Sequence, residues 1–168
     1  MVLCPTPSAK YMDELKHKII TMRPGDSYAF DGGEIIAVAA YHPGYRYSFK
    51  ARTDGRALGY VIRTSKSTLY YSGDTKYFEV FRQVGNEYQP DLALLNVNSH
   101  LSPPDVLRAV RDLSPTKVIP SHYGAYGGSN VGKSDRFRRI LADDLDSMWL
   151  ELVVGESCSL TGERLPRR

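Results

Sequence analysis

Several features that organise other classes of protein are scarce or absent in this sequence of 168 residues. It contains only two cysteines, Cys4 and Cys158, which lie near opposite ends of the chain and form no Cys-x-x-Cys pair. A disulfide framework and a cysteine zinc knuckle are therefore excluded as the organising principle. No apolar run approaches the roughly 18 residues that a membrane span requires, and the residues after Met1 lack the charged start of a secretory signal. From these absences we expect a cytoplasmic protein with no membrane span.

Charge of one sign is not in large excess either. Twenty-two Lys and Arg residues against nineteen Asp and Glu residues give a formal net charge of +3. A surface dedicated to nucleic acid is usually much more basic, so we expect no nucleic-acid partner. With 42% hydrophobic residues the chain is long enough to bury one core. We predict a single domain over residues 1–160, followed by a flexible C-terminal tail over residues 161–168.

Turn residues divide the first half of the chain into short segments typical of strands, and after Gly73 segments typical of strands and of helices alternate. The pattern predicts strands at 19–22, 27–30, 34–41, 56–64, 67–72, 92–97, 117–119 and 149–154, and helices at 9–18, 77–84, 104–113 and 134–145. The first strands should follow one another as a meander through the turns at 24–26 and 31–33. A β-rich half followed by an alternating half indicates an α/β fold with layered, mixed sheets.

Three of the four histidines, His42, His100 and His122, directly follow apolar, strand-like runs, and Asp74 follows such a run in the same way. Ligand sites gather at strand ends in α/β folds, because the strands fix the position of loops that escape the packing constraints of the core. Imidazole nitrogens and carboxylate oxygens suit Zn²⁺ or Mn²⁺, and a site with an open position favours hydrolysis. The alternative is that each histidine only forms hydrogen bonds within its loop and that Asp74 is a turn residue.

Four segments resemble, in their order and spacing, the second half of the metallo-β-lactamase fold. They are Tyr-Tyr-Ser-Gly-Asp-Thr at 70–75, Pro-Asp-Leu-Ala-Leu-Leu at 90–95, His-Leu-Ser-Pro-Pro-Asp-Val-Leu-Arg-Ala at 100–109 and Val-Ile-Pro-Ser-His-Tyr-Gly at 118–124. The sequence is most similar to the branch that contains L-ascorbate-6-phosphate lactonase and the N-acylphosphatidylethanolamine phospholipase D-like hydrolases. The resemblance runs from Leu3 to Val154. It implies a four-layer αββα sandwich, of which this chain holds mainly the second half.

The resemblance also implies roles for the four residues at the strand ends. His42 matches a ligand of the first metal, Asp74 the carboxylate that bridges two ions, and His122 a ligand of the second metal. His100 matches a histidine that contacts the substrate or its leaving group, so Asp74 and His100 are the expected catalytic residues. The implied activity is metal-dependent hydrolysis of a lactone, phosphodiester or related ester through a metal-bridging hydroxide. Two Zn or Mn ions are expected once further ligands complete the site.

One motif of this family is missing from the sequence. His-x-His-x-Asp-His, which supplies most of the family's metal ligands, occurs nowhere in the chain, and the remaining histidine, His17, lies in the helix predicted at 9–18. Three matching ligands would give each of two metals at most about two protein ligands, fewer than the three or four usual for zinc. We therefore expect that the N-terminal part of the fold is missing here. Either a homo-oligomer or an N-terminal-half partner completes the site, or the sequence is part of a longer gene product. The alternative is a truncated, non-catalytic binding or assembly module.

Overall fold

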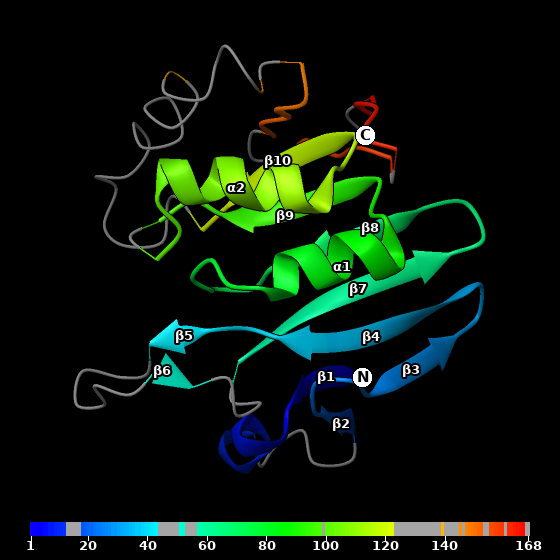
Figure 1. The fold of residues 1–168 in the computed structure, drawn as a ribbon. Coiled ribbons are helices and arrows are strands. Elements are labelled where there is room, and N and C mark those ends of the chain that lie inside the picture. Colours follow the sequence, from blue (N-terminus) through cyan, green and yellow to red (C-terminus); the bar gives the residue numbers. More distant parts are fainter. Residues whose placement is uncertain are drawn as a thin grey trace.

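A six-stranded mixed sheet forms the centre of the computed structural model, and helices α1 and α2 lie against one of its faces (Figure 1). The strand order is β10-β9-β8-β7-β4-β3. The bounds are β3 (Ser27–Phe30), β4 (Gly33–Ala39), β7 (Leu58–Thr64), β8 (Thr68–Tyr71), β9 (Leu92–Asn96), β10 (Lys117–Ser121), α1 (Val80–Tyr88) and α2 (Pro103–Leu113). The structure describes residues 1–12, 18–43, 51–52, 57–98, 100–122, 139, 145, 147–152, 155–159 and 161–166. The predicted α/β fold class is confirmed.

Two short strand pairs lie beside the main sheet. β1 (Val2–Pro5) pairs in parallel with β2 (Ile19–Met22). β5 (His42–Pro43) pairs in antiparallel orientation with β6 (Ala51–Arg52). The β5 strand extends the line of β4 beyond the edge of the sheet (Figure 1). It therefore carries His42, one of the candidate ligands, past the end of the central strands.

The direction of the strands changes in the middle of the sheet. β3, β4, β7 and β8 are antiparallel neighbours, whereas β8, β9 and β10 run parallel to one another. Parallel neighbours need crossover connections, and α1 and α2 supply them between β8 and β9 and between β9 and β10. The carboxyl ends of these three strands therefore meet at one edge, where α/β sheets usually bind ligands.

The main core lies between the sheet and the two helices. Alternate residues of the central strands are buried against the helices: Val61, Tyr70, Ala93, Leu95 and Val118. The helices contribute Phe81, Val84, Val106, Ala109 and Val110 to the same cluster. Burying a large apolar side chain contributes about 1.5–3 kcal/mol. This packing holds the strand ends, and so the loops that follow them, in fixed positions.

The hydroxyl of Tyr70 is an unpaired polar group inside this core. The side chain is fully buried, and its hydroxyl has no hydrogen-bond partner in the described part of the chain. Burial raises the pKa of Tyr70 far above its ordinary value. Because a buried hydroxyl without a partner destabilises the fold, Tyr70→Phe is expected to raise the free energy of unfolding by about 1 kcal/mol in urea denaturation. Tyr71→Phe, at an exposed position, is the control, and a less stable Tyr70→Phe protein would contradict the prediction.

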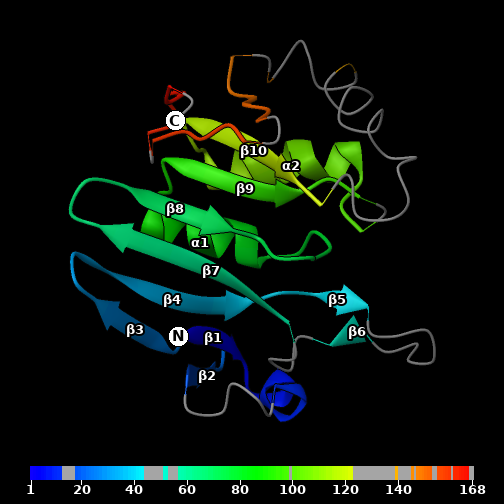
Figure 2. The same ribbon diagram turned by 180° about the vertical axis from the view of Figure 1, so that it is seen from behind.

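The opposite face of the sheet is covered by neither α1 nor α2 (Figure 2). Met22, Ala37 and Leu58 form a small buried cluster that joins part of this face to β1 and β2. Tyr71 points to this face, since successive strand residues alternate and Tyr70 points to the helices, and 39% of its surface is exposed. Layered folds normally bury both faces of such a sheet. On the same face Leu92 and Ile119 are buried with Leu150 of the C-terminal segment, so within the described residues this face is covered only in part.

Two predictions for the N-terminal region are wrong. In place of the helix at 9–18 the structure has a 3₁₀ helix, η1 (Thr6–Tyr11), and residues 13–17 lie outside the described residues. The segment that forms η1 is short and begins between two prolines, and short segments of this kind favour a 3₁₀ helix. The strand at 19–22 exists as β2, but it pairs with β1 and does not begin a meander with β3. Its apolar residue Met22 packs onto Ala37 and Leu58, so that β2 lies against the sheet and does not extend it.

The later predictions differ mainly at their ends. The helix at 77–84 begins later, as α1, because Tyr77 and Phe78 belong to the loop that leads into it. Most of the helix at 134–145 lies outside the described residues. Residues 153 and 154 of the strand predicted at 149–154 lie outside the described residues, and residues 149–152 form only a parallel bridge between Trp149 and Val118. The domain boundary at 160 and the flexible tail stay predictions. No helix in the described part of the chain is long and apolar enough to cross a membrane.

Candidate metal centre

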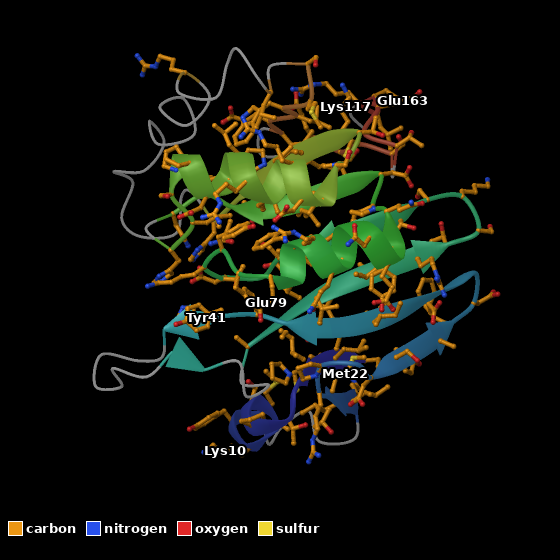
Figure 3. All side chains as sticks on the ribbon, in the orientation of Figure 1. Lys10, Met22, Tyr41, Glu79, Lys117 and Glu163 are labelled. Carbon is orange, nitrogen blue, oxygen red and sulfur yellow. The ribbon has the colours of Figure 1, made fainter. Side chains whose placement is uncertain are left out.

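The structure brings together all four residues that the sequence places at strand ends, with Asp74 at the centre. Asp74 Oδ2 lies 3.1 Å from His42 Nε2 and 3.9 Å from His100 Nε2. The other carboxylate oxygen, Asp74 Oδ1, lies 3.7 Å from His122 Nδ1. The group sits at the sheet edge that Tyr41 marks in Figure 3, whereas Lys117 marks the opposite end of β10. The two oxygens of one carboxylate thus face different histidines.

Asp74 owes its position to a sharp turn at the end of β8. Gly73 has a φ of +63°, and a Cβ atom there would lie 2.6 Å from the carbonyl oxygen of Leu58. Only glycine adopts this backbone without strain and leaves room for the neighbouring strand. The turn directs the chain from β8 over the end of the sheet, so that Asp74 faces the loops that follow β9 and β10.

Gly73→Ala tests the turn directly. The added methyl group meets Leu58 and the left-handed backbone is strained, so we expect the free energy of unfolding to fall by about 1–3 kcal/mol. Gly25→Ala is the matched control, because Gly25 also has a positive φ, +92°, but no atom lies within 4 Å of the place where its Cβ atom would stand. Urea denaturation of both variants separates the cost of the strained backbone from the cost of the contact with Leu58. Equal losses would show that the contact with Leu58 contributes nothing.

His42 is held beside Asp74 by hydrogen bonds between two loops. The N–H of Tyr41 donates to Thr75 Oγ1 at 2.8 Å, and the N–H of Lys76 donates to the carbonyl oxygen of Tyr41 at 2.9 Å. These bonds join the segment before β5 to the segment after β8. They fix the distance between the imidazole and the carboxylate before any ligand binds.

Two asparagines at the end of β9 complete the surroundings of Asp74. Asn98 Nδ2 donates to Asp74 Oδ1 at 2.8 Å, and the N–H of His100 donates to Asn98 Oδ1 at 2.8 Å. Asn96 is fully buried, and its Nδ2 lies 3.3 Å from Asp74 Oδ1 and 3.0 Å from the carbonyl oxygen of Thr75. Neither residue was predicted from the sequence. The available signal was an Asn-Val-Asn run that interrupts an apolar strand next to a candidate site.

The surroundings favour the neutral form of His100. Its pKa is lowered, first because partial burial disfavours the charged imidazole, and also because His42, Lys76 and His122 add positive charge, whereas Asp74 acts in the opposite direction. A neutral imidazole has a lone pair available for a metal ion or a proton. His122 takes a left-handed backbone, with a φ of +60°, directly after β10. Backbone of this kind in a non-glycine residue concentrates at functional sites.

The donor set fits a divalent cation. One ligand atom each from His42, Asp74 and His100 lies within 4.8 Å of the others. Ligands of a four-coordinate zinc lie about 3.4 Å apart when each bond is about 2.1 Å long, and the separations of 3.1 and 3.9 Å bracket that value. The prediction from the sequence grouped His42 and Asp74 with His122 instead. The roles of His100 and His122 therefore stay predictions.

Comparisons with known proteins match this architecture. A family profile described as the beta-lactamase superfamily domain matches residues 2–123. A UPF0173 metal-dependent hydrolase from Thermus thermophilus is 36% identical over 121 residues, which are 70% of this chain and 52% of that protein. A UPF0173 metal-dependent hydrolase from Pelotomaculum thermopropionicum is 37% identical over 109 residues, 62% of this chain and 48% of that protein. The chain spans about half the length of these relatives.

Solved structures show the same fold at lower identity. Igni18, a metallo hydrolase from Ignicoccus hospitalis, has a TM-score of 0.70 at 21% identity, over 97% of this chain and 66% of that one. An isothiocyanate hydrolase from Delia radicum gut bacteria has a TM-score of 0.69 at 15% identity, over 98% of this chain and 66% of that one. At these identities the likeness concerns the fold alone.

Proposed function

The chain belongs to the beta-lactamase superfamily, and we propose that it supplies the Asp74-centred site of a metal-dependent hydrolase that acts on a lactone, phosphodiester or related ester. The observation that carries the proposal is the position of Asp74, whose two oxygens face His42 and His100 on one side and His122 on the other. Curated relatives are named metal-dependent hydrolases, which supports the same class of reaction.

We assign the cation to His42, Asp74 and a third histidine of the group. His122 is the third ligand that the resemblance implies, and His100 is the one whose ligand atom lies within 4.8 Å of those of both His42 and Asp74. When bound, a Zn or Mn ion supplies Lewis acidity toward the scissile group and the attacking water. Asp74 orients the neighbouring imidazoles, and the histidine outside the ligand set is placed to donate a proton to the leaving oxygen. Asn96 and Asn98 hold the carboxylate in place.

We also propose that another protein surface completes the active site. The chain has no His-x-His-x-Asp-His motif, and one face of its sheet exposes Tyr71 and carries neither main helix. A second copy of the chain or an N-terminal-half partner would cover this face and bring further ligands to Asp74. A non-catalytic binding or assembly module is the alternative that the missing motif favours.

Hydrolysis assays separate the two functions. The full chain, alone and mixed with an N-terminal half of a relative, is incubated with Zn²⁺ or Mn²⁺ and a panel of one lactone, one phosphodiester and one carboxylic ester. We expect hydrolysis of at least one class, and we expect a chelator to stop it. Absence of metal-dependent hydrolysis from every mixture would contradict the proposed activity and favour the binding module.

A further inference from the structure

The side-chain amide of Asn98 lies between two groups that a second metal ion would need. Its nitrogen, Nδ2, is 2.8 Å from Asp74 Oδ1 and is also in hydrogen-bond contact with His122 Nδ1. Its oxygen, Oδ1, accepts the N–H of His100 at 2.8 Å and Nδ2 of Asn96 at 3.0 Å. Because two donors occupy the oxygen end, the amide can face Asp74 and His122 only with its nitrogen.

In this orientation the amide of Asn98 occupies a lone pair of Asp74 Oδ1. An amide nitrogen carries two hydrogens and offers no lone pair to a cation, so Asn98 gives one hydrogen to Asp74 Oδ1 and the other to His122 Nδ1. Asn96 Nδ2 approaches the same oxygen at 3.3 Å. A neutral amide therefore occupies the position between Asp74 Oδ1 and His122 that a bridged second cation would take.

The other oxygen of the carboxylate is in different surroundings. Asp74 Oδ2 is approached by the Nε2 atoms of His42 and His100, at 3.1 and 3.9 Å, and by no amide of the described residues. The two imidazole rings meet edge to face with their centroids 4.9 Å apart. Two imidazoles and one carboxylate oxygen are a ligand set typical of a catalytic zinc site, which keeps a further position open.

We propose that this chain holds one divalent cation, with His42, Asp74 Oδ2 and His100 as its ligands, and that Asn98 replaces the second cation. The inference rests on the proposed function only in requiring that the site binds metal. It assigns His100 to the metal and places His122 outside the ligand set, tied to the amide of Asn98. Asn98 is thus a positioning residue that determines how many ions the site takes.

Metal stoichiometry tests this inference without any substrate. The full 168-residue chain is titrated with Co²⁺, followed by visible absorption, and the bound metal is counted by elemental analysis after equilibrium dialysis. We expect about one ion per chain, a loss of affinity of at least about tenfold in His100→Ala, and one ion still bound in His122→Ala. Asn98→Asp replaces the amide with a carboxylate and is expected to raise the count to about two. Circular dichroism checks that each variant is folded, and His100→Gln is the second variant if His100→Ala is not.

The metal count and the ester panel together distinguish a failure of the one-ion inference from a failure of the proposed activity. Two ions in the unaltered chain, or one ion that depends on His122 and not on His100, would overturn the inference and leave metal-dependent hydrolysis standing. One ion with the expected ligand dependence, but no hydrolysis of any ester in the panel, would support the inference and overturn the proposed activity. A chain that binds no Co²⁺ overturns the inference, and the ester panel with the N-terminal half present then decides the proposed activity.

Discussion

Asp74→Asn is expected to abolish metal binding and hydrolysis together. The substitution keeps the shape of the side chain and removes the negative charge that both oxygens present to the surrounding histidines. Loss of an indirect partner of a metal ligand already costs about 10–100-fold in affinity, so loss of this carboxylate should cost more than about 100-fold. Calorimetric titration with Zn²⁺ measures the affinity, and the ester panel measures hydrolysis.

Glu79→Gln is the matched control for Asp74→Asn. It also converts a carboxylate to an amide, but Glu79 is exposed where the loop after β8 leads into α1. The control should bind Zn²⁺ with the affinity of the unaltered chain. Metal binding that survives in Asp74→Asn would contradict the central role given to this carboxylate.

Asn96→Ala should produce the second large effect, because it acts on both folding and metal binding. Asn96 is fully buried, its Oδ1 accepts the hydroxyl of Ser72 at 3.2 Å, and its Nδ2 reaches Asp74 and Thr75. Its loss leaves the carbonyl oxygen of Thr75 and the Ser72 hydroxyl with fewer partners inside the protein. We expect the free energy of unfolding to fall by about 2–3 kcal/mol and the Zn²⁺ affinity to fall by about 10–100-fold.

The two effects of Asn96→Ala are measured separately, by urea denaturation and by Zn²⁺ titration of the folded variant. Asn86→Ala is the control, since Asn86 lies exposed on α1 and should change neither quantity appreciably. A variant that loses stability but keeps its full metal affinity would show that Asn96 supports the fold and does not position Asp74.

The part of the site that follows apolar strands was predictable from the sequence. His42, Asp74, His100 and His122 each stand directly after such a run, and parallel pairing of β8, β9 and β10 brings the ends of those strands together. The strand and helix periods were also clear where one face is buried, as in β7 and α2. Here local pattern and tertiary packing favour the same structure.

The asparagines were not predictable in the same way. Asn96 and Asn98 are common loop residues by type, and only their hydrogen bonds to Asp74 reveal their role. Likewise, no local pattern distinguishes a strand that pairs with β3 from one that packs onto the sheet, as β2 does. The assignment of His100 and His122 depends on which carboxylate oxygen each histidine faces, a property of the assembled site alone.

Anomalous X-ray scattering at the zinc edge, from crystals of the chain grown with Zn²⁺, tests the central claim most directly. The account predicts a peak at coordination distance, about 2.0–2.2 Å, from His42 Nε2 and Asp74 Oδ2. A peak at other residues, or none within reach of Asp74, would contradict the claim that this carboxylate is the centre of a metal site.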